Sequence, residues 1–249
     1  MKMIFDIYHV LIYQPILNIL VGFYKTIAFY DFGLAVIFST IFIRLLLYPI
    51  FHKSAKHQLV MQKIQPKIEK LKELHKENKE KQLKATMDLY REHGINPMSG
   101  IFLLFLQAPV LIALFLIFSN KLTPEVLSSL YSFITAPANI NTSFLGLINL
   151  EQSSILMVSL AAILQYFQGK MMLPKIEKGR KLSTPESVGR QMVYFAPFLT
   201  LLIFMNMPAA ISLYWAVSVT FSIFQQIIIN RQFNPNPNEE PGKFRKKTD

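Results

Sequence analysis

Side chains that commonly perform catalysis or bind metals are sparse in this sequence and do not form a recognisable site. There is no cysteine, which excludes disulfides, thiolate metal sites and a lipid-modified cysteine. The motifs HExxH, GxSxG and GxGxxG and the phosphate-binding P-loop are absent. Five histidines occur without metal-ligand spacing, namely His9, His52, His57, His75 and His93. We therefore expect no catalytic residue, no metal and no cofactor.

Arg44 is the one ionisable side chain within the long apolar runs. A charge inside a membrane span costs several kcal/mol unless it reaches water, a partner or the interface. Two interpretations remain open. Arg44 lies eight residues before His52, about 12 Å at helical rise, so its side chain could extend toward cytoplasmic headgroups. Alternatively, with Thr40 one turn away on the same face, it could line a wet cavity.

Glutamines place uncharged polar groups in other apolar runs, at Gln107, Gln165 and Gln168. Taken singly, each is typical of a hydrogen bond between helices, whereas together they could line the same cavity as Arg44. A proton-coupled or ion-coupled transporter usually needs a buried carboxylate or histidine, and the apolar runs contain no aspartate or glutamate. Both interpretations of the glutamines, hydrogen bonds between helices and a wet cavity shared with Arg44, therefore remain open.

The elements that position these residues are membrane helices. The chain of 249 residues is 52% hydrophobic and 16% charged, with a mean hydropathy of +0.33, which is too apolar for an ordinary soluble domain. The uncharged run 191–230 is about twice the bilayer thickness, so we expect a break at Asn206-Met207-Pro208. The sequence predicts an all-α polytopic protein with five transmembrane helices, at 32–51, 98–118, 152–169, 191–207 and 208–230.

Positive charge is concentrated on one side of these spans. Of 26 lysines and arginines, 22 lie in three segments, the loop 52–97, the loop 170–190 and the tail 231–249. Segments 1–31 and 119–151 hold two and one. Basic loops stay in the cytoplasm, so we expect a multi-pass cell-membrane protein with its N-terminus outside and its C-terminus inside.

The segment 1–31 is predicted to be an extracytoplasmic, interfacial amphipathic helix. Gln14, Asn18 and Lys25 fall near one helical face, with leucines and valine elsewhere. A targeting signal or a sixth span are the alternatives, although a small-residue cleavage site does not precede Asp31.

The loop 52–97 is predicted to be a cytoplasmic helical hairpin that turns near Asn78. Two apolar stripes with helical spacing support it, Ile64, Ile68 and Leu71, then Leu83, Met87 and Tyr90. The hairpin either merely joins two spans or serves as a docking arm.

Several short motifs, in a shared order and spacing, resemble the YidC membrane protein insertases with their mitochondrial Oxa and chloroplast Albino relatives. The resemblance runs from about residue 13 to 231 and is closest to the short bacterial type without a large extracytoplasmic domain. Ser99, Ile101 and Ala210 depart mildly from the family pattern. The motifs are Asp31-Phe32-Gly33-Leu34-Ala35, Ile43-Arg44-Leu45, Tyr48-Pro49, Gln65-Pro66-Lys67, Leu89-Tyr90, Gly94-Ile95-Asn96-Pro97, Gln107-Ala108-Pro109-Val110-Leu111, Asn206-Met207-Pro208-Ala209, Leu213-Tyr214-Trp215 and Gln225-Gln226.

The resemblance implies an insertase that works without nucleotide hydrolysis. Five helices would enclose a hydrophilic groove, open to cytoplasm and lipid, in which Arg44 attracts the acidic tail of a client. The client helix would then slide along the second and fourth spans into lipid. By the same resemblance, the groove or its rim is formed by Arg44, Thr40, Gln107, Gln168, Tyr214 and Trp215. Tyr214 and Trp215 are equally typical of interfacial anchors.

The implied partners are membrane lipids and nascent membrane-protein clients, with the Sec translocon, the ribosome and the signal recognition particle system, and no DNA. The basic tail would contact ribosomal RNA or anionic headgroups. A small-solute channel or transporter, and a scaffold that assembles membrane proteins without moving them, are the alternative functions. A transporter typically shows inverted repeats, which this sequence lacks.

Overall fold

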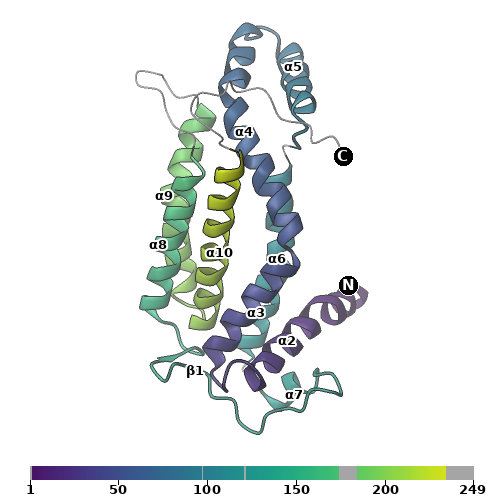
Figure 1. The fold of residues 1–249 in the computed structure, drawn as a ribbon, viewed down its shortest axis with the longest axis vertical. Coiled ribbons are helices and arrows are strands. Elements are labelled where there is room, and N and C mark those ends of the chain that lie inside the picture. The colour runs from purple at the N-terminus through teal and green to yellow at the C-terminus, as the bar shows by residue number, and fades with distance from the viewer. Residues whose placement is uncertain (1, 97, 121, 174–183, 234–249) are drawn as a thin grey trace.

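A computed structural model describes residues 2–96, 98–120, 122–173 and 184–233. Regular structure in these residues is almost entirely helical, which confirms the all-α class. The central helix, α10, packs against each of the other four apolar helices of the bundle (Figure 1). The bundle consists of α3 (Phe32–Leu46), α6 (Ser99–Ser119), α8 (Ile155–Met171), α9 (Thr184–Phe204) and α10 (Ala209–Phe233).

By length and hydropathy, three helices in the described residues are able to cross a membrane, Phe5–Lys25, Ser187–Phe204 and Ala209–Gln232. A fourth arises if the bent pair Phe32–Leu46 and Tyr48–Leu74 is counted as one span. Phe105–Ser119 and Ile155–Met171 are apolar but shorter. The chain is therefore a helical membrane protein, and the arrangement of five spans stays a prediction.

The predicted span 32–51 is not one helix. The helix α3 ends at Leu46, and α4 (Tyr48–Leu74) begins after Leu47 with a bend of 69°. Pro49, in the first turn of α4, has no N–H to continue the hydrogen-bond ladder of α3 and clashes with the preceding turn. The span predicted at 32–51 therefore bends after Leu46 and stays a prediction, and Arg44 lies in the last turn of α3.

The uncharged run 191–230 divides between Phe204 and Ala209, where α9 ends and α10 begins. The first N–H groups of α10 are satisfied by a distant segment, since Ala209 N donates to Gln152 O at 2.8 Å and Ala210 N donates to Leu150 O at 3.1 Å. These bonds join the start of α10 to the turn that precedes α8.

The N-terminal helix comprises α1 (Lys2–Tyr8), the π-helical segment η1 (His9–Tyr13) and α2 (Gln14–Lys25). Leu17, Leu20 and Val21 are fully buried in the main core. The residues predicted as its polar face bind the loop that follows α6. Asn18 Oδ1 accepts from Tyr131 N at 2.7 Å, and Lys25 Nζ donates to Thr135 O at 2.9 Å. Its placement in the membrane interface stays a prediction.

That loop contains α7 (Pro124–Leu127) and a short hairpin of β1 (Ser143–Phe144) and β2 (Ile148–Asn149), paired antiparallel. Asp31 fastens the hairpin to α3, because its Oδ1 accepts from Leu34 N at 2.8 Å and its Oδ2 accepts from Leu145 N at 2.6 Å. Phe144 lies over Gly33, where a Cβ atom would overlap the ring.

The helices α4 and α5 (Lys79–Glu92) form a hairpin beyond one end of the bundle (Figure 1). Asn78 caps α5, accepting from Lys81 N at 2.9 Å. Ile64 and Ile68 pack into a small core with Val60 and Ile95, with Leu89 and Tyr90 against it. Leu83 and Met87, predicted to continue the apolar stripe, are instead exposed.

Candidate functional site

Arg44 is buried within the protein. Its side chain lies at the end of α3 where α10 passes, and the residue is only 8% exposed. Nε donates to Ser218 Oγ on α10 at 3.3 Å. The guanidinium carbon lies 4.4 Å from the centre of the Phe51 ring in α4, within cation–π range. A neutral hydroxyl and an aromatic ring therefore cover this cation.

Tyr214 extends the polar contacts from Ser218 to α6. Gln107 Nε2 donates to the Tyr214 hydroxyl, which also interacts with Ser218 one turn further along α10. Tyr214 is 2% exposed, whereas Gln107 is only partly buried. We call Arg44, Gln107, Tyr214 and Ser218 the arginine network, and it connects α3, α6 and α10.

Trp215 belongs to a different network, although it follows Tyr214 directly. Its Nε1 donates to Gln165 Oε1 in α8 at 3.1 Å, and Thr200 Oγ1 in α9 donates to the same oxygen at 2.7 Å. Consecutive helical residues project about 100° apart, so adjacent side chains of α10 can contact different neighbouring helices. We call Gln165, Thr200 and Trp215 the glutamine network, and it connects α8, α9 and α10.

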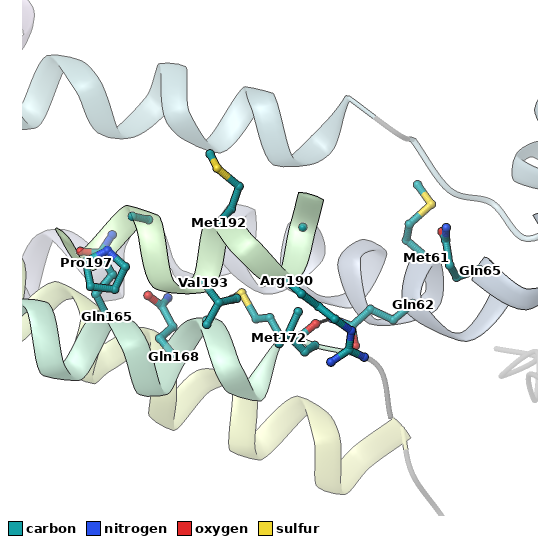
Figure 2. Close-up of a pocket in the computed structure, with 14 residues that line it drawn as sticks. Met61, Gln62, Gln65, Gln165, Gln168, Met172, Arg190, Met192, Val193 and Pro197 are labelled. Carbon is teal, nitrogen blue, oxygen red and sulfur yellow. Dashed lines mark hydrogen bonds between the residues drawn. The ribbon is translucent and has the colours of Figure 1, made fainter. Parts of the chain in front are cut away.

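Figure 2 shows a cavity of about 550 Å³ beside the glutamine network, between α4, α8 and α9. Gln165 and Gln168 line it from α8, and Gln62 and Gln65 line it from α4. Arg190 extends from α9 toward Gln62, whose Nε2 donates to Met172 O. Three flexible side chains add an adaptable apolar surface, Met61, Met172 and Met192.

The six predicted site residues fall into separate places. Arg44, Gln107 and Tyr214 meet in the arginine network, and Trp215 joins the glutamine network. Gln168 lines the cavity, whose described lining residues do not include Arg44. Thr40 is buried, and its hydroxyl donates within α3 to Val36 O at 2.6 Å.

Three contributors were missed by the sequence reasoning, namely Phe51, Thr200 and Ser218. Ser218 could have been found, because it stands one turn after Tyr214 on the same helical face. Phe51 could not, since its approach to Arg44 depends on the bend at Leu47. Nothing in the sequence distinguished Thr200 from any other threonine in an apolar run.

The described residues offer no group of three or more histidine, cysteine, aspartate or glutamate side chains able to hold a metal ion. A salt bridge among the described residues, Arg91 Nη1 to Asp88 Oδ1 at 3.6 Å, lies on the exposed surface of α5. In these parts of the chain, then, Arg44 has no carboxylate partner.

Comparison with known proteins supports the resemblance seen in the motifs. The family profile described as "60Kd inner membrane protein" matches residues 22–237. The "Membrane protein insertase YidC" of Pelobacter propionicus is 32% identical over 89% of this chain, which spans only 39% of that relative's length. The "Membrane protein insertase MisCA" of Bacillus subtilis is 28% identical, with 86% of this chain and 77% of the relative covered.

A third relative gives the same result. The "Membrane protein insertase YidC 1" of Listeria monocytogenes is 31% identical, with 84% of this chain and 68% of the relative covered. The family profile covers both the arginine network and the glutamine network, and it includes the hairpin of α4 and α5. This chain belongs to the 60Kd inner membrane protein family, that of the YidC insertases.

Proposed function

We propose that this protein is an insertase that moves membrane-protein clients from the cytoplasm into the bilayer and helps them fold. The observation that carries the proposal is the state of Arg44, a buried cation bonded to a neutral hydroxyl and covered by a ring. A buried charge without a counter-ion is costly, and attraction to an acid is strong where water is excluded. The acidic outer tail of a client is the anion that would replace Ser218 and Phe51.

Unused hydrogen-bonding capacity on the two helices beside Arg44 supports a polar path for that tail. Ser39 Oγ on α3 and Ser212 Oγ on α10 are buried and have no partner among the described residues. Buried hydroxyls of this kind gain from any polar group that reaches them. The groove of this proposal runs between α3 and α10, with Thr40, Gln107 and Tyr214 beside it.

The apolar part of the client would follow α6 and α9. Both helices expose large apolar side chains, among them Phe102 and Phe105 on α6 and Phe195 and Phe198 on α9. Removing apolar client surface from water is favourable by about 25 cal/mol per Å², so transfer into lipid drives the step without nucleotide hydrolysis.

The cavity in Figure 2 is the cytoplasmic entrance of this path. Its glutamines can bind the backbone of an unfolded segment, and its methionines can pack against varied apolar side chains. Trp215 and Gln168 stand at the boundary between entrance and groove. The hairpin of α4 and α5 would receive clients, the ribosome, the signal recognition particle system or the Sec translocon.

The proposed topology places the N-terminus outside and the C-terminus in the cytoplasm of a bacterial cell. The hairpin segment 52–97 carries 11 of the 22 basic residues that the positive-inside rule assigns to the cytoplasm. The end of the basic tail, from Lys243 to Lys247, was predicted to contact ribosomal RNA or headgroups and lies outside the described residues.

The test is insertion of a single-span client with an acidic outer tail into vesicles that contain the purified protein. Arg44→Glu should lower the insertion rate at least tenfold, because repulsion of the acidic tail replaces attraction. A tenfold change in rate requires a free-energy change of only about 1.4 kcal/mol. Arg44→Lys keeps the charge but loses the planar fork, so we expect a loss of about threefold or less.

Two controls make the result specific. Arg231→Glu reverses an exposed charge at the end of α10 and should insert the client at the wild-type rate. A client with a neutral tail should be affected much less by Arg44→Glu. Equal insertion of the acidic-tailed client by wild type and Arg44→Glu would contradict the proposed role of Arg44 and favour a scaffold.

A further inference from the structure

A tight turn with a left-handed backbone joins α2 to α3. Asp31 N donates to Ala28 O at 2.8 Å, and the two central residues, Phe29 and Tyr30, have φ angles of 51° and 60°. Positive φ at both central positions is the pattern of a type I′ turn, in which asparagine, aspartate and glycine are the usual residues. In this turn both positions hold aromatic side chains instead.

The hairpin of β1 and β2 closes with a turn of the same kind. Leu147 N donates to Phe144 O at 2.9 Å, and the central residues are Leu145, with a φ of 52°, and Gly146, with a φ of 69°. Glycine adopts positive φ readily, whereas leucine does not. The second turn therefore also places a bulky apolar side chain where the backbone disfavours one.

Positive φ costs a bulky residue free energy, because its Cβ atom is crowded against the backbone. In the part of the chain that the structure describes, the residues other than glycine with positive φ are Phe29, Tyr30 and Leu145. All three lie in these two turns. Strain of this kind persists where the surrounding structure fixes it, and it is concentrated at functional positions.

The two turns, residues 28–31 and 144–147, are neighbours, and we call them the paired turns. Asp31 Oδ2 accepts from Leu145 N at 2.6 Å, which joins the end of the first turn to the centre of the second. Figure 1 shows the connection between α2 and α3 close to the β1 hairpin, at the end of the bundle opposite α5. The paired turns are therefore held together as one unit.

Contacts with the bundle fix the paired turns at the level where apolar helices begin. Phe144 lies over Gly33 in the first turn of α3. Just after the hairpin, Leu150 O and Gln152 O accept from the first N–H groups of α10, a helix that is long and apolar enough to cross a membrane. Residues close to the first turn of a membrane-spanning helix lie near the boundary between hydrocarbon and headgroups.

The paired turns present large apolar side chains at that boundary. Phe29, Tyr30, Leu145 and Leu147 are between 58% and 85% exposed. The carboxylate of Asp31 is used within the protein, since both of its oxygens accept from backbone N–H groups. Turns that face water usually carry polar residues. Tyrosine, in contrast, is enriched where a membrane meets water, and phenylalanine and leucine transfer favourably out of water.

We propose that the paired turns insert into the lipid leaflet at this end of the bundle and anchor it there. The side chains of Phe29, Leu145 and Leu147 enter the upper part of the hydrocarbon, and the Tyr30 hydroxyl stays at the level of the headgroups. The partner of this surface is the bilayer itself. The strained backbone is retained because it directs these side chains into lipid. The inference rests on α10 as a membrane span and not on insertase activity.

The absence of cysteine from the chain allows a direct test. Leu147→Cys is labelled with a small environment-sensitive fluorophore, and the purified protein is placed in lipid nanodiscs, in which both membrane faces are open to the buffer. Fluorescence is then quenched either by iodide in the buffer or by lipids that carry a nitroxide on the acyl chain near the headgroup. The same label at Phe29→Cys repeats the measurement in the other turn.

The control label is at Asn139→Cys, an exposed position in the loop before the hairpin. We expect the ratio of lipid quenching to iodide quenching to be at least about threefold higher at Leu147→Cys than at Asn139→Cys, because apolar side chains at the interface leave water for lipid. Since the nanodiscs hold only this protein and lipid, a different protein cannot be what shields the label.

A second variant tests whether the apolar side chains hold the turns in lipid. Phe29→Asn combined with Leu145→Asn introduces a residue that type I′ turns favour, so the melting temperature in detergent should not fall. In that background the quenching ratio of the Leu147→Cys label should decrease at least about twofold, because two apolar anchors are lost. Phe133→Asn removes another exposed aromatic side chain, outside the paired turns, and should leave the ratio unchanged.

Two outcomes would overturn the proposal. One is a quenching ratio that is no higher at Leu147→Cys and Phe29→Cys than at Asn139→Cys, which would mean that the paired turns face water. The other is an unchanged ratio at Leu147→Cys after Phe29→Asn and Leu145→Asn, in a protein that still unfolds cooperatively. That result would mean that the two side chains do not anchor the turns.

Discussion

The Arg44 guanidinium carbon and the Phe51 ring centre lie 4.4 Å apart across the bend between α3 and α4. Phe51 is itself 8% exposed, so the ring is fixed by its surroundings and covers the cation on the side facing the hairpin. The same contact that stabilises the bend therefore also limits access to the charge. Any movement of α4 relative to α3 has to alter the contact between Arg44 and Phe51.

Removal of this ring should expose the surroundings of Arg44. The chain has no cysteine, so Thr40→Cys introduces a single thiol one turn from Arg44. We expect Phe51→Ala to raise the rate at which a charged thiol reagent labels that cysteine by about fivefold, because a cation–π contact contributes roughly 1 kcal/mol.

Phe51→Tyr keeps the ring and should leave labelling slow. Ser119→Cys, an exposed position at the end of α6, should react at the same rate in both backgrounds. If Phe51→Ala labels no faster than the protein with its ring intact, Phe51 does not cover Arg44.

Asn18 should hold the loop after α6 against the N-terminal helix. Its Oδ1 accepts from Tyr131 N at 2.7 Å, and its Nδ2 donates to Gln14 O at 2.7 Å and to Ser129 O at 3.3 Å. Asn18→Ala leaves the Tyr131 amide without this partner, which costs about 1–3 kcal/mol. Hydrogen exchange at residues 129–135 should accelerate, whereas Asn139→Ala, an exposed change in the same loop, should have little effect. Unchanged exchange in Asn18→Ala would contradict this role.

Gly33 and Phe144 should be energetically coupled. A Cβ at Gly33 would overlap the Phe144 ring, so Gly33→Ala should lower the stability by about 1–3 kcal/mol. Addition of Phe144→Ala should restore part of that loss, measured as a thermal double-mutant cycle in detergent. Gly22→Ala is the matched control, because its Cβ would meet only Ile134 Cδ1 at 3.8 Å. Additive effects of the two changes would rule out the contact.

His57 should make the stability of the hairpin depend on pH. Burial lowers the pKa of His57, and the nearby charges of Lys53 and Lys56 lower it further. The folded protein then binds the proton less readily than the unfolded chain, whose histidine titrates near pH 6.5. The stability is therefore complete above about pH 6.5 and decreases as the pH falls through the lowered pKa.

Thermal unfolding at pH 8 and pH 5 checks this expectation. His57→Gln should reduce the difference between the two pH values, and Lys56→Gln should reduce it less, since it removes only one repulsive charge. An identical pH dependence in His57→Gln and wild type would show that the ring does not carry the effect.

The sequence was sufficient for features that depend on local chemistry. The break between α9 and α10 follows from Pro208 in a run too long for one span, and the cap at Asn78 follows from side-chain preference. The isolated position of Arg44 among apolar residues also marked it as a candidate site residue before any contact was known.

Features that depend on the relative placement of helices were not predictable. Tyr214 and Trp215 were both predicted to face the groove or its rim, but their polar atoms bind different neighbours. The reason is that the angle of α10 against α6 and α8 is set by packing of the whole bundle. The bend at Leu47 was missed for a related reason. A proline near the end of an apolar run can sit in the first turn of a new helix or follow the last turn of an old one, and tertiary packing decides between them.

The length of α4 gives that bend a mechanical meaning. A helix of 27 residues is about 40 Å long, so α4 acts as a lever with Leu47 as its fulcrum. A rotation of about 10° at the fulcrum displaces the far end by about 7 Å, more than one helical turn of 5.4 Å. In the same way, a force applied to the hairpin near Asn78 reaches the bend at Leu47, close to the contact between the Phe51 ring and the Arg44 guanidinium.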